Sequence, residues 1–247
     1  RWVIPALLLI ATLALYAPTF RYQTVNYDDP WLLEANTKLQ QLSITDVPSL
    51  FTDFSTATRN MLGAEYLPIR DLSIGLDYAV WGNWYQGFHL TQVVLYALTV
   101  MLLYIMLRGF GLSLKLALAA TTLWAVHPIH VESVAWLTER KGVLAAFFVM
   151  AAGCAYLRYR NYTASRPRLW LAIAAVLTAC AVWSKAVALF AFGGLAMLDV
   201  CLLSADPRRW RGLATIGVTA LLAFVPVFAT AHRANVLINE DMANGTA

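Results

Sequence analysis

Long apolar runs separated by short polar segments dominate the chain. They lie at about residues 2–20, 88–107, 113–127, 142–157, 169–184, 186–203 and 212–231. A spanning helix needs about 20 mostly apolar residues, whereas the spans of a β-barrel alternate over about ten. These runs are continuous, so the pattern predicts about seven transmembrane helices. The run at 113–127 is short, and we expect it to extend into its flanks.

The one long segment between runs, residues 21–87, carries apolar side chains at helical spacing. One set is Trp31, Leu32, Ala35, Leu39 and Leu42, and a second is Leu72, Leu76, Ala79 and Val80. Asp46 precedes Val47-Pro48-Ser49 as a residue does at a helix start. The segment therefore predicts two or three amphipathic helices that lie along the membrane surface.

Composition agrees with the runs. Hydrophobic residues make up 60% and charged residues 13% of the 247 residues, against about 45–50% and about 25% in soluble domains. A soluble enzyme, a disordered chain and a nucleic-acid-binding domain are excluded. We expect an all-α polytopic membrane protein with a single transmembrane module over 1–247. Residues 232–247 would form a polar tail that either continues into a longer protein or closes a minimal module.

Charge sets the expected orientation. With seven spans and residue 1 inside, ten Lys/Arg and two acids lie inside, against eight Lys/Arg and twelve acids outside. Short loops rich in Lys/Arg stay cytoplasmic. The long loop 21–87 and the tail 232–247 are then extracytoplasmic. The inner face holds little but arginines, so we expect chemistry at the outer boundary, periplasmic in a bacterium or lumenal in the endoplasmic reticulum of a eukaryote.

Two adjacent acids follow the first span, in Asn26-Tyr27-Asp28-Asp29-Pro30. Neighbouring carboxylates at a membrane boundary repel each other. One of them can serve as a general base that takes a proton from an acceptor hydroxyl. The alternative is a solvated turn that starts a helix. We favour Asp28 as the base because it lies nearer the first span.

Two histidines close the third run. His127 and His130 share a face if the segment is helical, and Glu132 is near them. A third metal ligand at fixed spacing is absent, so interfacial anchoring is favoured over metal binding. No cofactor is assigned, and a divalent metal stays open. Arg140 and Lys141 follow, and with a histidine they predict a cationic pocket for a phosphate.

Other polar residues complete the outer set. Lys185 lies between two apolar runs and must either snorkel or meet an anion. Arg70 is either a phosphate ligand or a surface charge. The adjacent Asp71 is expected to point away from it on a helix. Asp71, His89 and Glu132 are assigned supporting roles.

These motifs form a familiar series. They are Asp28-Asp29, Tyr66-x-Pro68-x-x-x-Leu72-Ser73-x-x-Leu76-Asp77-Tyr78, Trp81-Gly82, Gly87-Phe88-His89, His127-Pro128-Ile129-His130-Val131-Glu132-Ser133-Val134-Ala135-Trp136, Glu139-Arg140-Lys141-Gly142 and Ser184-Lys185. The series resembles the glycosyltransferases of the GT-C fold. It is most similar to transmembrane O-mannosyltransferases that carry tetratricopeptide repeats and to their bacterial relatives. No 34-residue repeat occurs here, and Gln92 stands where Asn is frequent in the family.

The resemblance implies a catalytic Asp in the first outer loop and a polyprenyl-phosphate-linked sugar as donor. We therefore expect a membrane glycosyltransferase that moves a sugar, such as mannose, to a hydroxyl of a protein or glycan acceptor, above all Ser/Thr of an exported protein. Its partners would be donor, acceptor and lipid bilayer, with no nucleic acid. The alternative is a non-catalytic scaffold or a module that binds lipid-linked glycans. A transporter is disfavoured, since charges within the spans are scarce.

Overall fold

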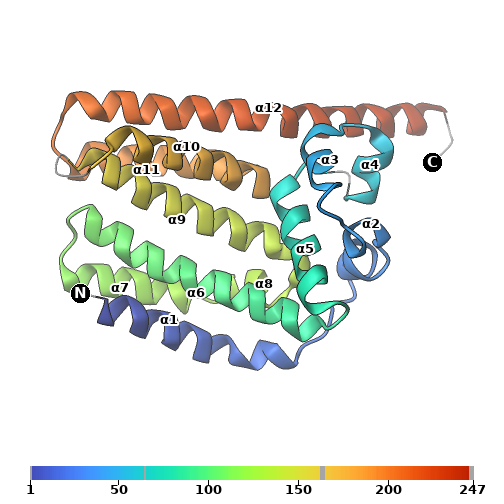
Figure 1. Ribbon diagram of the computed structural model, residues 1–247, viewed down its shortest axis with the longest axis horizontal. Coiled ribbons are helices and arrows are strands. Elements are labelled where there is room, and N and C mark those ends of the chain that lie inside the picture. The colour runs from blue at the N-terminus through green and yellow to red at the C-terminus, as the bar shows by residue number, and fades with distance from the viewer. Residues whose placement is uncertain (1, 64, 162–164, 245–247) are drawn as a thin grey trace.

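The computed structural model describes residues 2–63, 65–161 and 165–244. Every regular element in that part of the chain is a helix, and Arg1 lies outside it. Figure 1 shows a bundle of long helices running side by side, with a group of shorter helices at one end. The bundle consists of α1 (Val3–Tyr16), α6 (Tyr85–Gly109), α7 (Leu114–Ala125), α9 (Arg140–Arg160), α10 (Pro167–Ser184), α11 (Ala188–Leu202) and α12 (Pro207–Asn244).

Each of the seven predicted runs forms a helix, but the helices differ in length. Five segments are long and apolar enough to cross a membrane, and α7 and α11 are shorter. With 12 and 15 residues, these two span only about 18 and 22 Å of a hydrocarbon layer about 30 Å thick. The expected extension of the third run is absent, because α7 ends at Ala125 ahead of Pro128, and proline disfavours helix at the residue before it.

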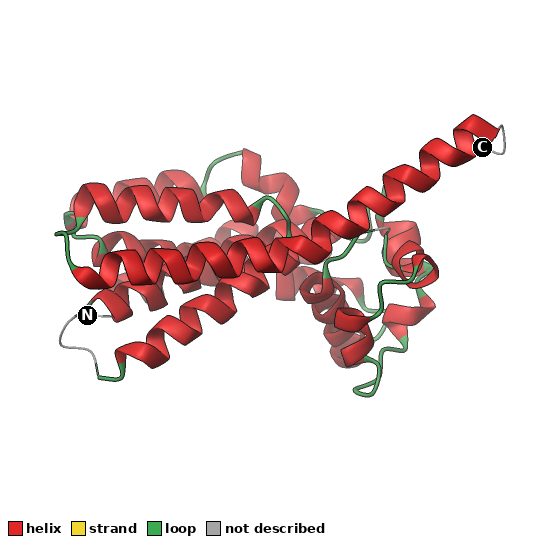
Figure 2. Cartoon of the chain, turned by 90° about the horizontal axis from the view of Figure 1, so that it is seen from above, coloured by secondary structure: helices red, strands yellow, loops and turns green. Residues whose placement is uncertain are grey.

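The last helix continues beyond its apolar run. α12 extends to Asn244 and carries Pro226 in its interior, so the predicted polar tail begins as helix. In Figure 2 this helix projects past the end of the bundle.

The middle of the bundle is α9, which lies between α6 and α10 (Figure 1). Small side chains make this close packing possible. Ala152, Ala155 and Ala181 are buried, and a Cβ added at Gly153 would lie 2.4 Å from the sulfur of Met106. The central helix is thus fixed by contacts that larger side chains would prevent.

Residues 22–84 form a unit that we call the cap. It contains a short π-helix (Pro30–Glu34), α2 (Thr37–Gln40), α3 (Val47–Thr52), α4 (Thr56–Met61) and α5 (Pro68–Trp81). The helix predicted after Asp46 is confirmed as α3. The predicted stripe from Trp31 to Leu42 is broken between the π-helix and α2. Leu32, Leu39 and Leu50 are fully buried in a core of the cap, which Phe88 and Leu137 from outside the cap complete.

The longest helix of the cap, α5, has its polar side inside. Arg70, Asp71 and Asp77 are buried, whereas Leu76 and Val80 are 56% and 68% exposed. An apolar outer stripe over a polar inner face suits a helix that borders lipid. The prediction of a surface-lying helix is therefore consistent with what α5 exposes.

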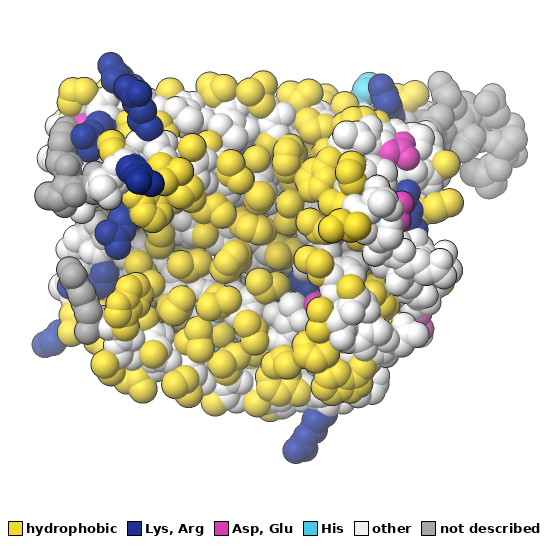
Figure 3. Space-filling model, viewed as in Figure 1, with side chains coloured by type: hydrophobic (Ala, Val, Ile, Leu, Met, Phe, Trp, Pro, Cys, Tyr) yellow, Lys and Arg dark blue, Asp and Glu magenta, His cyan; other side chains and the backbone are white. Residues whose placement is uncertain are grey.

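The opposite end of the bundle, which we call the arginine end, gathers most of the Lys and Arg side chains seen in Figure 3. The two acids expected among these arginines are paired with them. Asp199 is fully buried and lies 3.0 Å from Nε of Arg160 and 2.8 Å from Nε of Arg209, and Asp206 also pairs with Arg160 at 2.5 Å. A buried carboxylate needs such partners, and here they join α9, α11 and α12.

Candidate active site

The two adjacent acids have different surroundings. Asp29 is fully buried, and both of its carboxylate oxygens accept hydrogen bonds. Oδ1 accepts from the backbone N–H of Thr138 at 3.1 Å and from the hydroxyl of the same residue. Oδ2 accepts from the backbone N–H of Val25 at 2.8 Å. Asp29 therefore ties the start of the cap to the segment that leads into α9.

Asp28, in contrast, is partly exposed. Its Oδ1 accepts one long hydrogen bond, 3.4 Å, from the indole of Trp31. The preceding Tyr27 is 71% exposed and packs edge-on against Trp136, with ring centroids 5.4 Å apart. Asp28 therefore presents a carboxylate with free lone pairs, next to the buried and fully hydrogen-bonded loop position of Asp29.

Arg140 is buried and committed to partners within the chain. Its guanidinium lies 2.6 Å from Asp77 and donates to the carbonyl of Phe88 at 2.9 Å and to the hydroxyl of Ser73 at 3.1 Å. It also donates to the side-chain oxygen of Gln92. These contacts join α9 to α5 and α6, and they occupy the donors that a phosphate would need.

Arg70 is paired as well, and the expectation that it points away from Asp71 is wrong. Its Nε donates to Asp71 at 2.9 Å, and its Nη1 lies 2.6 Å from Glu65. The long arginine side chain folds back on the first turn of α5, which residue spacing alone does not reveal. Burial raises the pKa of Asp71 even though Arg70 opposes that rise, so the ion pair offsets only part of the cost of burying this carboxylate.

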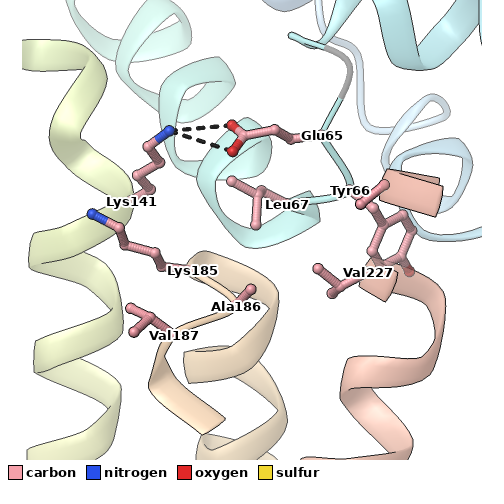
Figure 4. A pocket seen from close by; sticks show the side chains of 9 residues that line it. Glu65, Tyr66, Leu67, Lys141, Lys185, Ala186, Val187 and Val227 are labelled. Atoms are coloured by element: carbon pink, nitrogen blue, oxygen red, sulfur yellow. Dashed lines mark hydrogen bonds and ion pairs between the residues drawn. The ribbon is translucent and has the colours of Figure 1, made fainter. Parts of the chain in front are cut away.

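A pocket of about 340 Å³ lies where the cap meets α9, α10 and α12. It is lined by Glu65, Tyr66, Leu67, Lys141, Lys185, Ala186, Val187, Val227 and Ala231. Figure 4 shows Lys141 reaching it from α9 and Lys185 from the junction of α10 and α11. Two of the predicted cationic residues, distant in the sequence, therefore meet at one cavity.

Each lysine of this pocket has a single acidic partner among the described residues. Nζ of Lys141 lies 3.3 Å from Glu65, and Nζ of Lys185 lies 2.8 Å from Glu139. An ammonium group has three donors, so each retains capacity for a ligand. The facing wall is apolar, with Leu67 and Val227, and Val187 lies beside Lys185 (Figure 4). The pocket can accept an anionic group attached to an apolar chain.

The rings of His127 and His130 are neighbours, with centroids 6.2 Å apart. The ring of His130 lies 4.3 Å from Trp124, and His127 is exposed and accepts from the backbone N–H of Ile129. Burial, and then His127, lowers the pKa of His130, so the ring is neutral at pH 7. Contact with an aromatic ring suits an interfacial anchor.

The remaining supporting residues lie apart from the pocket. His89 is buried and bonds through Nε2 to the carbonyl of Gln23 at 3.1 Å, and Glu132 is exposed. No group of three or more metal-ligating side chains occurs in the described ranges.

Sequence reasoning gave no role to three residues of this region. Glu65 and Glu139 hold the two lysines, and Thr138 holds Asp29. The signal for the acids was available in principle, because lysines near a membrane boundary call for neighbouring carboxylates. The threonine carries no such signal.

Fold and site together define a polytopic helical membrane protein with a cap over a lysine-lined pocket. Residues 69–233, about two thirds of the chain, match the family described as dolichyl-phosphate-mannose-protein mannosyltransferase. The chain therefore belongs to this family. The matched range contains Arg140, Lys141 and Lys185 and begins after Asp28 and Asp29.

Curated relatives carry related names. Protein O-mannosyl-transferase Tmtc2 of Drosophila melanogaster is 34% identical over 137 residues, which cover 54% of this chain and 15% of that protein. Protein O-mannosyl-transferase TMTC4 of Mus musculus is 26% identical over 199 residues, covering 72% of this chain and 27% of that protein. The chain thus spans about a quarter or less of the length of these relatives. No solved structure matches it.

Proposed function

We propose that the chain is the membrane module of a glycosyltransferase that uses a polyprenyl-phosphate-linked sugar. The sugar is mannose, in line with the names of its family and relatives. The acceptor is a hydroxyl group, on Ser or Thr of an exported protein. The observation that carries this proposal is the pocket in which Lys141 and Lys185 face an apolar wall. A lipid phosphate has the same combination of charge and hydrocarbon.

In this mechanism Asp28 is the general base. The acceptor hydroxyl oxygen attacks the anomeric carbon of the sugar and forms the new glycosidic bond, while its proton passes to Asp28. The bond between that carbon and the phosphate oxygen breaks, and polyprenyl phosphate leaves with the electron pair. Lys141 and Lys185 stabilise the charge that builds on the phosphate, because ammonium groups at a low-dielectric boundary act strongly on developing charge.

The assignment of Asp28 rather than Asp29 follows from hydrogen bonding. Asp29 accepts three hydrogen bonds and is fully buried, so an acceptor hydroxyl cannot reach its carboxylate. Asp28 is partly exposed and accepts one long bond. Asp29 is accordingly a positioning residue, which holds the loop of Asp28 beside the segment that begins α9.

The other predicted cations act indirectly in this scheme. Arg140 and Arg70 fix α9 and the cap through buried ion pairs. His127 and His130 anchor the boundary of α7 and α8 (Ile129–Ala135). The cap, which contains Asp28 and Asp29 and contributes to the pocket, lies at the end of the bundle opposite the arginine end (Figure 1). This arrangement supports an extracytoplasmic site by the positive-inside rule.

Transfer of mannose from a polyprenyl-phosphate mannose to a Ser/Thr peptide by the full-length protein tests the proposal. Asp28→Asn should lower the rate about 10²–10⁴-fold while donor binding persists. Asp29→Asn should instead lower the melting temperature, since an amide places N–H groups against donors. If Asp28→Asn transfers sugar at the wild-type rate, Asp28 is not the base and the mechanism is wrong. If the wild-type protein binds the donor but transfers no sugar, the non-catalytic, glycan-binding alternative replaces the proposal.

The pocket is tested by donor binding. Lys141→Met and Lys185→Met should each weaken it about 10- to 150-fold, the value of a charge-assisted hydrogen bond. Lys115→Met is the matched control, because Lys115 is an exposed lysine on α7 outside the pocket. Equal weakening by all three variants would contradict a phosphate site at this pocket.

A further inference from the structure

The arginine end contains a second and larger groove, remote from the cap. It lies between α1, α6, α9 and α10 and has a volume of about 990 Å³. This is at the upper end of the range of roughly 300–1,000 Å³ found for ligand pockets. Its apolar lining includes Leu102, Ile105, Trp170, Ile173 and Leu177. These residues belong to helices long enough to span the membrane, so the groove borders lipid.

Two arginines stand on the lining of this groove without an acidic partner. Arg108 and Arg158 are exposed, and in the described part of the chain no carboxylate lies within ion-pair distance of either. Arg108 comes from the last turn of α6 and Arg158 from the last turn of α9. Arg160, which also lines the groove, is neutralised by Asp199 and Asp206.

We propose that this groove binds an anionic phospholipid of the leaflet at the arginine end. The phosphate sits between Arg108 and Arg158, and an acyl chain runs along the apolar lining toward the middle of the bundle. Guanidinium groups suit phosphate because they donate two parallel hydrogen bonds. The pairing of unneutralised cations with a continuous apolar lining matches an amphiphile rather than a free phosphate. This site is independent of the proposed transferase pocket.

Trp170 supplies a local probe, because it lines the groove. Lipids with brominated acyl chains quench tryptophan on contact, and the difference in quenching between wild type and Trp170→Phe isolates this side chain. We expect brominated phosphatidylglycerol to quench Trp170 at a lower mole fraction than brominated phosphatidylcholine does. Arg108→Gln and Arg158→Gln should each reduce this preference roughly fivefold, the contribution of one cation near anionic lipid.

Arg211→Gln is the matched control. Arg211 is an exposed arginine at the same end, on α12 and outside the groove, so its removal should leave the preference unchanged. An equal loss in the Arg211 variant would show a diffuse surface effect and overturn the proposal. Wild-type protein gives a test without arginine variants: unlabelled phosphatidylglycerol should restore the Trp170 signal more effectively than phosphatidylcholine. Equal restoration by the two lipids would also overturn it.

Discussion

Replacing Arg140 by methionine separates structural from ligand-binding arginines at the cap. Arg140 is 1% exposed and meets Asp77 at 2.6 Å, with a further hydrogen bond to the carbonyl of Phe88 at 2.9 Å. Arg140→Met leaves the carboxylate of Asp77 buried without its cation. Removing one partner of a buried ion pair costs about 3–5 kcal/mol. For a chain of this size that corresponds to a fall in melting temperature of about 6–20 °C.

The neighbouring lysine is the matched control. Lys141 is adjacent in sequence, its side chain is 18% exposed, and its contact with Glu65 is 3.3 Å long. A pair of this kind contributes about 0–1 kcal/mol, so Lys141→Met should melt within a few degrees of wild type. It should nevertheless weaken donor binding, whereas Arg140→Met should act mainly on stability.

The assay is thermal unfolding in detergent, followed by intrinsic tryptophan fluorescence. Burial raises the pKa of Asp77, and Arg140 opposes that rise. Without Arg140 the carboxyl group therefore takes up a proton more readily, which limits the loss. Arg140→Met/Asp77→Asn should recover part of the melting temperature, since no charge is then left buried. If Arg140→Met has the melting temperature of the wild type but fails to bind the donor, Arg140 is a ligand-binding residue and the reasoning is refuted.

Four further predictions follow from other sites. Gly63→Ala should cost about 1–2 kcal/mol by thermal unfolding, because Gly63 has φ +81°. The pKa of His130 is lowered in the folded protein, so its contribution to stability is complete above about pH 6.5 and is lost as the pH falls below that value. The melting temperature should therefore be lower at about pH 5.5 than at about pH 7.5, and His130→Phe should reduce this difference. Asp199→Asn should cost about 3–5 kcal/mol, because two buried arginines lose their shared carboxylate; a melting point like that of wild type would contradict this. In a background without the native cysteines, Lys38→Cys should react with an impermeant thiol reagent from outside and Arg211→Cys should not; the reverse pattern would invert the proposed orientation.

The seven apolar helices could be predicted because hydropathy is a local property. The prediction that the run at 113–127 extends into its flanks was wrong, because α7 ends at Ala125, ahead of Pro128. The prediction of one helical stripe from Trp31 to Leu42 was wrong for another reason. Short helices in the cap are fixed by packing on its own core, and apolar spacing does not reveal where one helix stops and the next begins.

Several residues that line or border the candidate site could be singled out from the sequence. Asp28, Asp29, Lys141 and Lys185 stood out because polar groups are costly at a membrane boundary. The different surroundings of the two acids could not be predicted, since Asp29 bonds to Thr138, which is 109 residues away in the sequence. Helical spacing likewise could not show that the long side chain of Arg70 folds back onto its neighbour.

The bond between Asp29 and Thr138 also sets an order of events during synthesis. At roughly 5–20 residues per second, the ribosome reaches Thr138 about 5–20 s after Asp29. Arg140, which forms an ion pair with Asp77, is likewise synthesised after Asp77. Once residue 84 has been made, the cap is complete but still lacks the partners of Asp29 and Asp77. The newborn protein therefore passes through a stage in which these carboxylates remain hydrated and the cap is open to proteases and chaperones.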